Sequence, residues 1–286
     1  MAAITFLGAG LMGAALAEAA AKRGDRVTVW NRTPAKAQAL EHFGIRAAAT
    51  VLQAVDGAER VHVMLSDDGA VDSVLEAAGE GLRSALLIDH STTSPAGTAA
   101  RAKRLEARGI AFLHAPVFMT PKMCRDAGGM MLVAGPKATF DRAEPALRAM
   151  TGRVDYLGER RDLAAANKLF GNAMIITLCA GLADVFAMAA SLGIEATDAQ
   201  ALFTRFNPSG VLTYRGASMA KGDYTPTFEL TMARKDARLM IDTAKEHELA
   251  VLPGIAQRMD ALIERGFGGD DLGVLAVDAV PKAAQP

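Results

Sequence analysis

A glycine-rich segment near the N-terminus places the strongest constraint on the fold of this chain. A short apolar run, Ile4 to Leu7, leads into GAGLMG, and an alanine-rich run from Leu11 to Arg23 follows. Gly8, Gly10 and Gly13 therefore have G-x-G-x-x-G spacing between a predicted strand and a predicted helix. Such glycines allow a sharp turn and bring backbone N–H groups against a pyrophosphate. Because a second predicted strand follows, the context favours a dinucleotide site over a glycine-rich turn in an unrelated α/β fold. The expected contacts are Gly8, Ala9, Gly10, Leu11, Met12 and Gly13.

Alternating short apolar runs and alanine-rich segments extend from Ala3 to about Leu157, which is typical of βαβ units and a parallel sheet. The expected strands are 4–7, 26–30, 60–65, 85–89, 111–115, 131–134 and 153–157. The expected helices between them are 11–23, 35–43, 70–77, 95–107 and 139–149. After Gly158 the strand pattern stops, and helical segments continue from Leu163 to about Arg265. We predict an α/β Rossmann-type doubly wound parallel sheet (1–161), then an all-α substrate and dimerisation domain (162–286) that starts with a long interdomain helix.

The end of the second predicted strand favours NADP(H) over NAD(H). Chains that bind NAD(H) place an acidic residue there to hold the ribose hydroxyls, whereas this chain reads WNRTPAK from Trp30. No carboxylate is present to repel a 2'-phosphate, and Arg32 can pair with one. Thr33 is expected at the N-cap of a helix with Pro34 at its first position. The alternative is that the basic residues only form a solvated surface. The expected cofactor contacts are Asn31, Arg32, Thr33 and Lys36.

Composition excludes several classes of partner. The chain has 286 residues and a formal net charge of −1, so no overall field attracts nucleic acid or an anionic membrane. Cys124 and Cys179 belong to no Cys-x-x-Cys or Cys/His cluster, so neither a disulfide framework nor a metal site is expected. The N-terminus lacks the basic region and cleavage site of a signal peptide. We expect a cytoplasmic protein that binds a small molecule and neither nucleic acid nor membrane.

An uncharged stretch from Leu169 to Ala183 is the most membrane-like part of the sequence. It is shorter than the roughly 20 apolar residues that a spanning helix needs. We therefore favour a buried interdomain helix over a membrane span. Since apolar and small residues occur on all sides of this helix, it needs more partners than one small helical domain supplies. We expect a homodimer that buries it.

Four further motifs follow GAGLMG along the chain. They are MLSDD at 64–68, DHSTTSP at 89–95, NKLFGN at 167–172 and ARKDARLMIDTAKE at 233–246. In this order the five motifs resemble the β-hydroxyacid dehydrogenases, the family of 3-hydroxyisobutyrate, tartronate semialdehyde and glyoxylate reductases. The resemblance spans nearly the whole sequence. It implies that a strand-end loop lies over the cofactor and comprises Met64, Leu65 and Ser66.

The resemblance also implies roles for two residues outside this loop. Thr92 matches a hydroxyl residue near the nicotinamide ribose, and Lys235 matches a lysine that approaches cofactor and substrate from the C-terminal domain. The alternatives are that Thr92 caps the helix after Pro95 and that Lys235 pairs with Asp236.

The same resemblance identifies Lys168 as the catalytic residue, which donates a proton when a carbonyl is reduced and accepts it in reverse. Its position on an apolar helix agrees, because desolvation lowers the pKa of a lysine towards neutral pH. Asn172, one helical turn further on, is expected to hydrogen-bond the substrate or orient the lysine. Without the resemblance, a lone lysine on such a helix is more often a snorkelling or domain-boundary residue.

One segment departs from the family pattern. Where the family reads Asp-Ala-Pro-Val-Ser-Gly-Gly to receive a substrate carboxylate, this chain reads HAPVFMT from His114 to Thr120. A phenyl ring donates no hydrogen bond, and side chains in place of glycines crowd the backbone. Ala127 and Gly128 also replace the usual Gly-Thr. We therefore expect a more apolar pocket, or a carboxylate held by Lys122, Arg125 or Lys235, and a structural role for His114. The expected substrate contacts are Phe118, Met119, Thr120 and Lys122.

These observations favour an NADPH-dependent oxidoreductase that transfers hydride between NADP(H) and a small aldehyde, keto or hydroxy compound. An imine reductase is the first alternative, because WNRTPAK and the apolar segment around Phe118 also resemble that group, although its members generally lack the lysine. A non-catalytic NADP-binding scaffold or sensor is the second alternative, since the carboxylate loop is lost.

Overall fold

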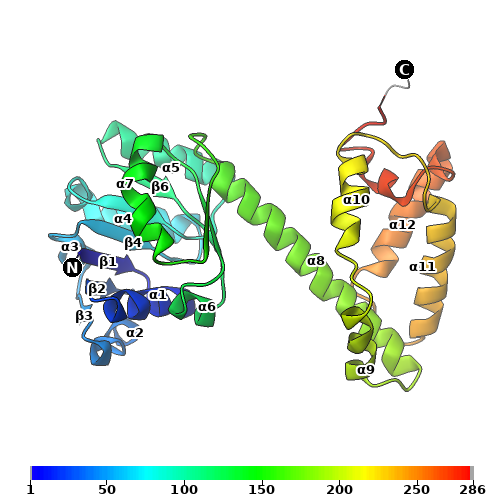
Figure 1. The fold of residues 1–286 in the computed structure, drawn as a ribbon, viewed down its shortest axis with the longest axis horizontal. Coiled ribbons are helices and arrows are strands. Elements are labelled where there is room, and N and C mark those ends of the chain that lie inside the picture. The colour runs from blue at the N-terminus through cyan, green and yellow to red at the C-terminus, as the bar shows by residue number, and fades with distance from the viewer. Residues whose placement is uncertain (1, 284–286) are drawn as a thin grey trace. The chain divides into compact units, whose positions relative to one another are not determined.

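The structure is a computed structural model that describes residues 2–283. The chain folds into two compact units, 1–172 and 173–286. The first unit is built on a six-stranded sheet in the order β3-β2-β1-β4-β5-β6, in which all neighbours are parallel (Figure 1). Its strands are β1 (Ala3–Leu7), β2 (Arg26–Trp30), β3 (Arg46–Ala47), β4 (Arg60–Val63), β5 (Leu86–Asp89) and β6 (Phe112–His114). This architecture confirms the Rossmann-type prediction.

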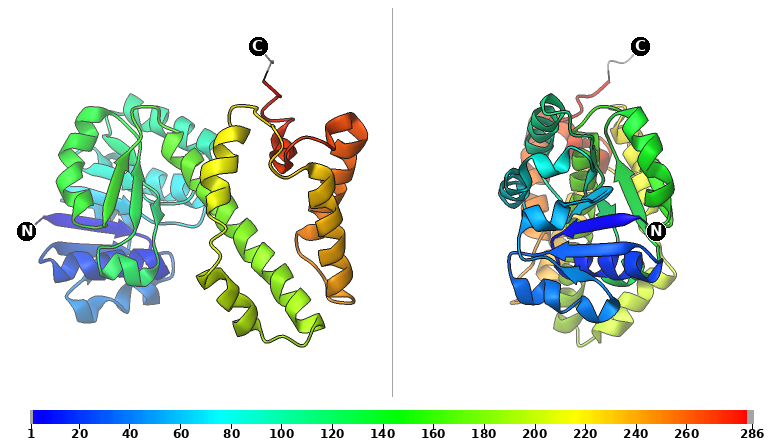
Figure 2. Two further views of the ribbon diagram at one scale, coloured as in Figure 1. Left: turned by 45° about the vertical axis from the view of Figure 1, so that its right-hand side comes forward. Right: turned by 90° about the vertical axis from the view of Figure 1, so that its left-hand side faces the viewer.

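Helices cover both faces of this sheet because side chains alternate between the faces along each buried strand. Ile4 and Phe6 of β1 pack with α1 and α7, whereas Leu7 packs on the opposite face with α3, α4 and α5. Figure 2 shows the two helical layers from the side. The helices are α1 (Leu11–Lys22), α2 (Pro34–Gln38), α3 (Val51–Val55), α4 (Asp68–Ala78), α5 (Pro95–Ala107), α6 (Pro121–Arg125) and α7 (Lys137–Arg148), with 3-10 turns η1 (Glu41–Phe43) and η2 (Gly79–Leu82).

A second, three-stranded sheet extends the first unit. Strand β7 (Val117–Phe118) pairs antiparallel with β8 (Met130–Val133), which pairs parallel with β9 (Arg153–Tyr156). The sequence pattern did not predict β3, β7, α3 or α6. Each has only two to five residues, which is too short for a period of 2 or 3.6 to be recognised.

The second unit is helical, as predicted. Besides the end of α8 (Leu163–Ser191) it contains α9 (Ala196–Ala201), η3 (Leu202–Thr204), α10 (Gly210–Met219), α11 (Leu230–Ala244), α12 (Leu252–Leu262), the π-helical turn η4 (Ile263–Phe267) and η5 (Leu272–Ala276). Its core is formed by Leu230 and Ala237 of α11, Met259 and Leu262 of α12, and Val274 of η5.

Helix α8 is exceptional for its composition. It is the one helix in the described part of the chain that is long and apolar enough to cross a membrane, with a mean hydropathy of 2.0 over a window of which 11% is buried. Large apolar side chains on it are exposed, among them Phe170, Ile175 and Ile176. The chain divides within this helix, whereas the sequence pattern predicted a domain boundary just before it.

Candidate functional site

Most of the predicted cofactor residues lie in loops that follow the carboxyl ends of strands in the parallel sheet, whereas Lys235 lies on α11 in the second unit. Strands β2 and β3 lie on one side of β1, and β4 to β6 lie on the other. The chain direction across the sheet therefore reverses between β1 and β4. In open α/β sheets, ligands bind at such a switch point. The loops after β1, β2, β4 and β5 meet at this edge.

The three glycines after β1 serve different purposes. Gly8 has a φ of +115°, and a Cβ there would lie 2.1 Å from the carbonyl oxygen of Met64. A Cβ on Gly13 would lie 2.1 Å from the carbonyl oxygen of Gly8, so the chain itself excludes side chains at both positions. A Cβ on Gly10 would meet no described atom within 4 Å. The open space at Gly10 is where a pyrophosphate would approach the backbone.

The N-terminus of α1 faces the same space. Gly10 is its N-cap, no side chain accepts a hydrogen bond there, and the first turn holds no acidic residue. The free N–H groups and the helix dipole therefore favour a negatively charged ligand. Leu11 is 82% exposed beside this loop, whereas Met12 packs against the core.

Asn31 connects the loop after β1 to the loop after β2 through two hydrogen bonds. Its Oδ1 accepts the N–H of Ala9 at 3.0 Å, and its Nδ2 donates to the carbonyl oxygen of Thr33 at 3.0 Å. Both polar ends of Asn31 and the N–H of Ala9 are thus already engaged. The geometry makes Asn31 a positioning residue for the glycine loop.

The basic residues after β2 are free to bind an anion. Arg32 and Lys36 are exposed, and neither forms an ion pair within residues 2–283. Thr33 occupies the N-cap of α2 with Pro34 behind it, as predicted, but its hydroxyl does not cap the helix. The side chains of Arg32 and Thr33 therefore both remain available at the carboxyl end of β2.

Hydrogen bonds tie the loop after β4 to the loop after β5. The N–H of Leu65 donates to Oγ of Ser91 at 3.0 Å, and the N–H of Ser94 donates to Oδ2 of Asp68 at 2.8 Å. Arg101, 1% exposed, supports the same carboxylate through an ion pair of 2.9 Å with Asp68. The segments MLSDD and DHSTTSP are therefore held together by hydrogen bonds at the carboxyl edge of the sheet.

The side chain of Thr92, in the segment DHSTTSP, has no structural role in the hydrogen bonds of this edge. It is exposed and forms no side-chain hydrogen bond among the described residues, whereas Ser94 caps α5 by accepting the N–H of Gly97 at 3.0 Å. The helix-capping alternative for Thr92 is therefore wrong. In the neighbouring loop, Ser66 donates its hydroxyl to Asp67 at 2.6 Å, and Met64 is half-buried.

Lys168 is buried at the start of α8, with 9% of its surface exposed. Its Nζ donates to the carbonyl oxygen of Val117 at 2.7 Å and lies 3.9 Å from the centre of the Phe118 ring. Burial lowers the pKa of Lys168. Since no carboxylate pairs with it in the described chain, the carbonyl and the ring face are what stabilise its charged form.

Phe118 fits against Gly171 of the same helix. A Cβ on Gly171 would lie 2.3 Å from Cζ of the Phe118 ring. The ring thus fills the space above position 171, one turn from Lys168. Asn172 is half-buried on the next position, and its side chain makes no hydrogen bond to the described residues. Lys168 and Gly171 therefore face the segment that departs from the family pattern.

The other expected substrate contacts are engaged elsewhere. Met119 packs against the core, with its Sδ 3.7 Å from Sγ of Cys124. Thr120 caps α6 by accepting the N–H of Met123 at 3.2 Å. Ala127 has a φ of 51°, in the left-handed region that favours glycine, at a position where the family has one.

Each of the three cations considered for a substrate carboxylate has an acidic partner. Lys122 pairs with Asp126 at 2.5 Å and Lys235 pairs with Asp236 at 2.9 Å, as the alternative for Lys235 predicted. Arg125 pairs with Glu18 at 2.6 Å, and Glu18 is nearly buried. A substrate carboxylate would have to compete with these partners.

His114 has a structural environment. It is fully buried, and its Nε2 lies 3.1 Å from the carbonyl oxygen of Ser91 and 3.3 Å from Oγ1 of Thr93. Burial lowers the pKa of His114, which favours the neutral ring. The expected structural hydrogen-bonding role agrees with this geometry.

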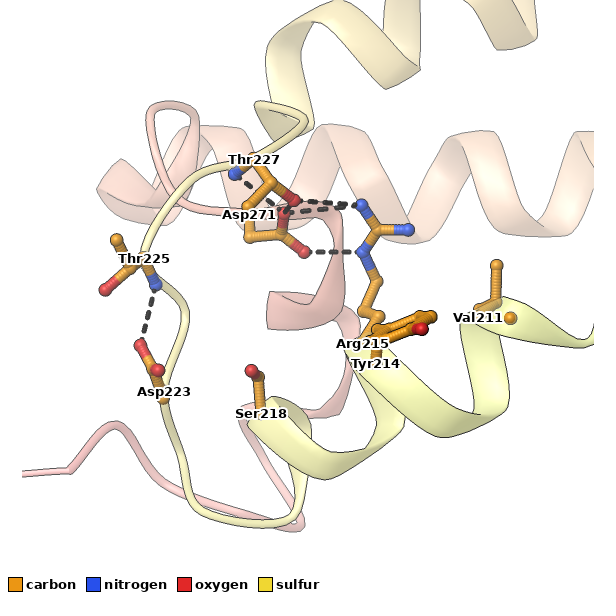
Figure 3. A pocket seen from close by; sticks show the side chains of 9 residues that line it. Val211, Tyr214, Arg215, Ser218, Asp223, Thr225, Thr227 and Asp271 are labelled. Carbon is orange, nitrogen blue, oxygen red and sulfur yellow. Dashed lines mark hydrogen bonds and ion pairs between the residues drawn. The ribbon is translucent and has the colours of Figure 1, made fainter.

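The second unit contains a pocket of about 280 Å³ between α10, the loop 223–227 and Asp271 (Figure 3). Its main polar group is the buried carboxylate of Asp271, which accepts from Nε of Arg215 at 2.7 Å and from Oγ1 of Thr227 at 2.7 Å. Asp271 also accepts the N–H groups of Phe228 and Gly273. Because these contacts satisfy both oxygens, we interpret this cluster as structural. No sequence pattern predicted this cluster.

The fold and the glycine loop define a dinucleotide-binding protein. A family profile for the NAD binding domain of 6-phosphogluconate dehydrogenase matches residues 3–158. A second profile, for the NAD-binding of NADP-dependent 3-hydroxyisobutyrate dehydrogenase, matches residues 163–276. The chain belongs to the β-hydroxyacid dehydrogenase family and is an NAD(P)-binding oxidoreductase.

The relatives of this chain include glyoxylate/succinic semialdehyde reductases and reductive aminases. Glyoxylate/succinic semialdehyde reductase 2 of Arabidopsis thaliana is 28% identical over 99% of this chain and 80% of its own length. The NADPH-dependent reductive aminase of Aspergillus oryzae is 25% identical over 95% of both chains. A reductive aminase from Aspergillus terreus, solved in complex with NADPH and ethyl levulinate, has a TM-score of 0.90 at 26% identity, covering 98% of this chain and 99% of that one.

Proposed function

We propose that this protein is an NADPH-dependent reductase for a small, uncharged carbonyl compound, with Lys168 as the proton donor. The observation that carries the proposal is the environment of Lys168, a buried ammonium held by the Val117 carbonyl and the Phe118 ring. When bound, NADPH supplies the hydride. The balanced reaction converts C=O, NADPH and a proton into CH–OH and NADP⁺.

The lysine's environment suits proton transfer. The Val117 carbonyl orients the ammonium, and the ring face excludes water from one side of it. Because burial lowers the pKa of Lys168, its proton is released more readily to a substrate oxygen that gains negative charge. The resulting neutral amine recovers its proton from solvent. Asn172, on the following turn, is proposed to hydrogen-bond the substrate oxygen.

The cofactor preference rests on the loop after β2. Arg32 and Lys36 are exposed, lack ion-pair partners in the described chain, and lie where an acidic residue would repel a 2'-phosphate. Asn31 keeps the glycine loop in place beside them. NADPH is therefore proposed over NADH.

The substrate is proposed to be uncharged because the chain offers no free cation for a carboxylate among those considered. Lys122, Arg125 and Lys235 are all ion-paired, and Phe118 stands where a hydroxyl donor is expected. A carboxylate left without a charge-assisted partner would lose much of its binding energy on desolvation.

Imine reduction is the second candidate. The aromatic segment around Phe118 favours it, and two of the similar proteins are named reductive aminases. The presence of Lys168 favours the carbonyl reaction, since an iminium substrate beside a buried ammonium would be repelled.

A homodimer through α8 is proposed to bury its exposed apolar side chains. Both ionisable groups near the two ends of this helix are bound by protein, because Lys168 donates to Val117 and Asp184 accepts the N–H of Leu252 at 2.9 Å. Folded protein therefore surrounds both ends, which fits a second copy of the chain better than lipid.

The test is a substrate screen that follows NADPH absorbance with aldehydes, β-keto acids and cyclic imines. We expect turnover with uncharged aldehydes or ketones, and faster turnover of cyclic imines would favour the second candidate. In Lys168→Met, carbonyl turnover should fall by at least about a hundredfold while NADPH affinity is retained. Tight NADPH binding without turnover of any class would contradict both enzymes and support a scaffold.

A further inference from the structure

A second pocket in the N-terminal unit lies away from the cofactor edge. It has a volume of about 460 Å³ and is lined by Ala2 and Ile4 at the amino end of β1, by Arg60 at the start of β4, and by the end of α7. The pocket follows β1 from Ala2 to Phe6, on the face of the sheet that packs against α1 and α7, whereas the glycine loop follows the carboxyl end of the strand. No part of the proposed reduction uses this pocket.

Three arginines from three elements line it. Arg23 follows α1, Arg60 begins β4 and Arg142 lies on α7. None forms an ion pair within residues 2–283, whereas the buried Arg101 is paired with Asp68 and Asp72. Asp25 is the only carboxylate among the lining residues, and its Oδ1 accepts the N–H of Ala2 at 3.2 Å. The pocket therefore carries an excess of positive charge.

Two consecutive hydrogen bonds determine which ring nitrogen of His62, a buried histidine that lines the pocket, carries the proton. The carbonyl oxygen of Ala115 accepts from Nδ1 of His90 at 2.7 Å, which makes Nε2 of neutral His90 an acceptor. That Nε2 lies 2.9 Å from Nδ1 of His62, so His62 must donate to it. The remaining Nε2 of neutral His62 therefore bears a lone pair and accepts hydrogen bonds.

This acceptor has no partner. His62 lines the pocket, is 1% exposed, and its Nε2 forms no hydrogen bond among the described residues. Nε of Arg60, beside it, is likewise buried and unpartnered. Leaving a buried polar atom without a hydrogen bond costs free energy. Nε2 of His62 is an acceptor and Nε of Arg60 is a donor, so a ligand that pairs with both must offer a donor and an acceptor.

A protonated phosphate group has this combination. Its charged oxygens accept from guanidinium groups, and its remaining hydroxyl donates one hydrogen bond. We propose that the pocket binds a phosphate-type oxyanion, with Arg23, Arg60 and Arg142 receiving its charge and its hydroxyl donating to Nε2 of His62. Sulfate matches its size and charge but has no hydroxyl at neutral pH, so the histidine distinguishes the two anions.

The experiment is calorimetric titration of the full chain, saturated with NADPH so that the cofactor site is closed, with inorganic phosphate, glycerol phosphate and sulfate at pH 6, where about half of a phosphate monoester still carries a proton and sulfate carries none. We expect both phosphates to bind and sulfate to bind at least about tenfold more weakly. Tighter binding of glycerol phosphate would identify a phosphorylated metabolite as the occupant, and tighter binding of inorganic phosphate would identify the free ion. In parallel, the imidazole resonances of His62 should shift with phosphate in NMR spectra.

Arg142→Met tests the site without disturbing the core, because Arg142 is exposed on α7. It should weaken phosphate binding about tenfold. Arg205→Met, which removes an exposed arginine of the second unit that has no ion pair within residues 2–283, should leave phosphate binding unchanged. Absence of phosphate binding in the NADPH-saturated protein, equal affinity for sulfate, or an unchanged affinity in Arg142→Met would each overturn the proposal.

Discussion

The ammonium group of Lys168 lies 3.9 Å from the centre of the Phe118 ring, and no carboxylate in the described chain pairs with it. An aromatic face in this position stabilises the charged lysine by about 1–2 kcal/mol when the pair is desolvated. Phe118 therefore opposes the effect of burial, which lowers the pKa of Lys168.

Phe118→Leu should accordingly lower the pKa of Lys168 further. Since the proposed proton donor acts only while protonated, reductase activity is lost as pH rises through this pKa. The alkaline limb of the kcat/KM profile should move to lower pH by about one unit. Phe206→Leu, which alters an exposed phenylalanine in the second unit, serves as the control. An unmoved limb in Phe118→Leu would show that the ring does not influence the lysine.

Gly171→Ala should destabilise the protein because its Cβ would overlap the Phe118 ring at 2.3 Å. We expect a loss of about 1–3 kcal/mol in the free energy of unfolding, measured by denaturant titration. Gly181→Ala on the same helix meets no atom within 4 Å, so its better helix propensity should stabilise by up to about 1 kcal/mol. In a Phe118→Ala background the overlap is absent, so Gly171→Ala should cost clearly less there than in the unmodified protein. An equal cost in both backgrounds would contradict the assigned contact.

Arg32→Gln should weaken NADPH binding without weakening NADH binding. A charge-assisted hydrogen bond to the 2'-phosphate contributes about 1.5–3 kcal/mol, so the Kd for NADPH should rise roughly 10- to 150-fold. Fluorescence titration of both cofactors measures this. Equal losses for NADPH and NADH would place Arg32 away from the 2'-phosphate.

Ile176→Glu tests the role of α8, where this side chain is 68% exposed. Light scattering of the unmodified protein should give twice its 29.9 kDa mass, and the charged variant should dissociate. Leu52→Glu, at an exposed position on α3, is the matched control and should remain dimeric. Partition of the unmodified protein into the detergent phase would instead support a membrane-bound helix.

Acid should destabilise the second unit through Asp271. Burial alone would raise the pKa of this carboxyl, but hydrogen bonds from Arg215, Gly273 and Thr227 hold it well below its ordinary value of 3.8. A carboxyl group whose pKa is lower in the folded state than in the unfolded state stabilises the fold at pH values above its unfolded-state pKa. This stabilisation is lost as the pH falls below the unfolded-state pKa and towards the folded-state pKa. Calorimetry at pH 7 and pH 3 should show this loss.

Asp271→Asn gives the matching mutational test. It should cost about 3 kcal/mol at pH 7, because it leaves Arg215 unpaired, and should flatten the dependence of stability on acid. Asp236→Asn, at an exposed pair with Lys235, should change stability by less than about 1 kcal/mol. Equal effects of the two substitutions would contradict the structural role of Asp271.

Local patterns in the sequence were sufficient for the main architecture. The glycine spacing and the alternating apolar runs depend on neighbours within one βαβ unit, so the parallel sheet and the glycine loop between β1 and α1 followed from residues close in the chain. No local pattern predicted the short elements β3, β7, α3 and α6, because they form only when distant strands and helices supply their partners.

Tertiary structure alone decided which side chains meet. Phe118 and Gly171 are far apart in sequence, and only the docking of α8 against β7 places one ring over both Gly171 and Lys168. Likewise, neighbouring strands bring His62 to His90. Secondary structure arises from short-range periodicity, whereas the partner of a buried polar group depends on strand order and packing, which no local pattern encodes.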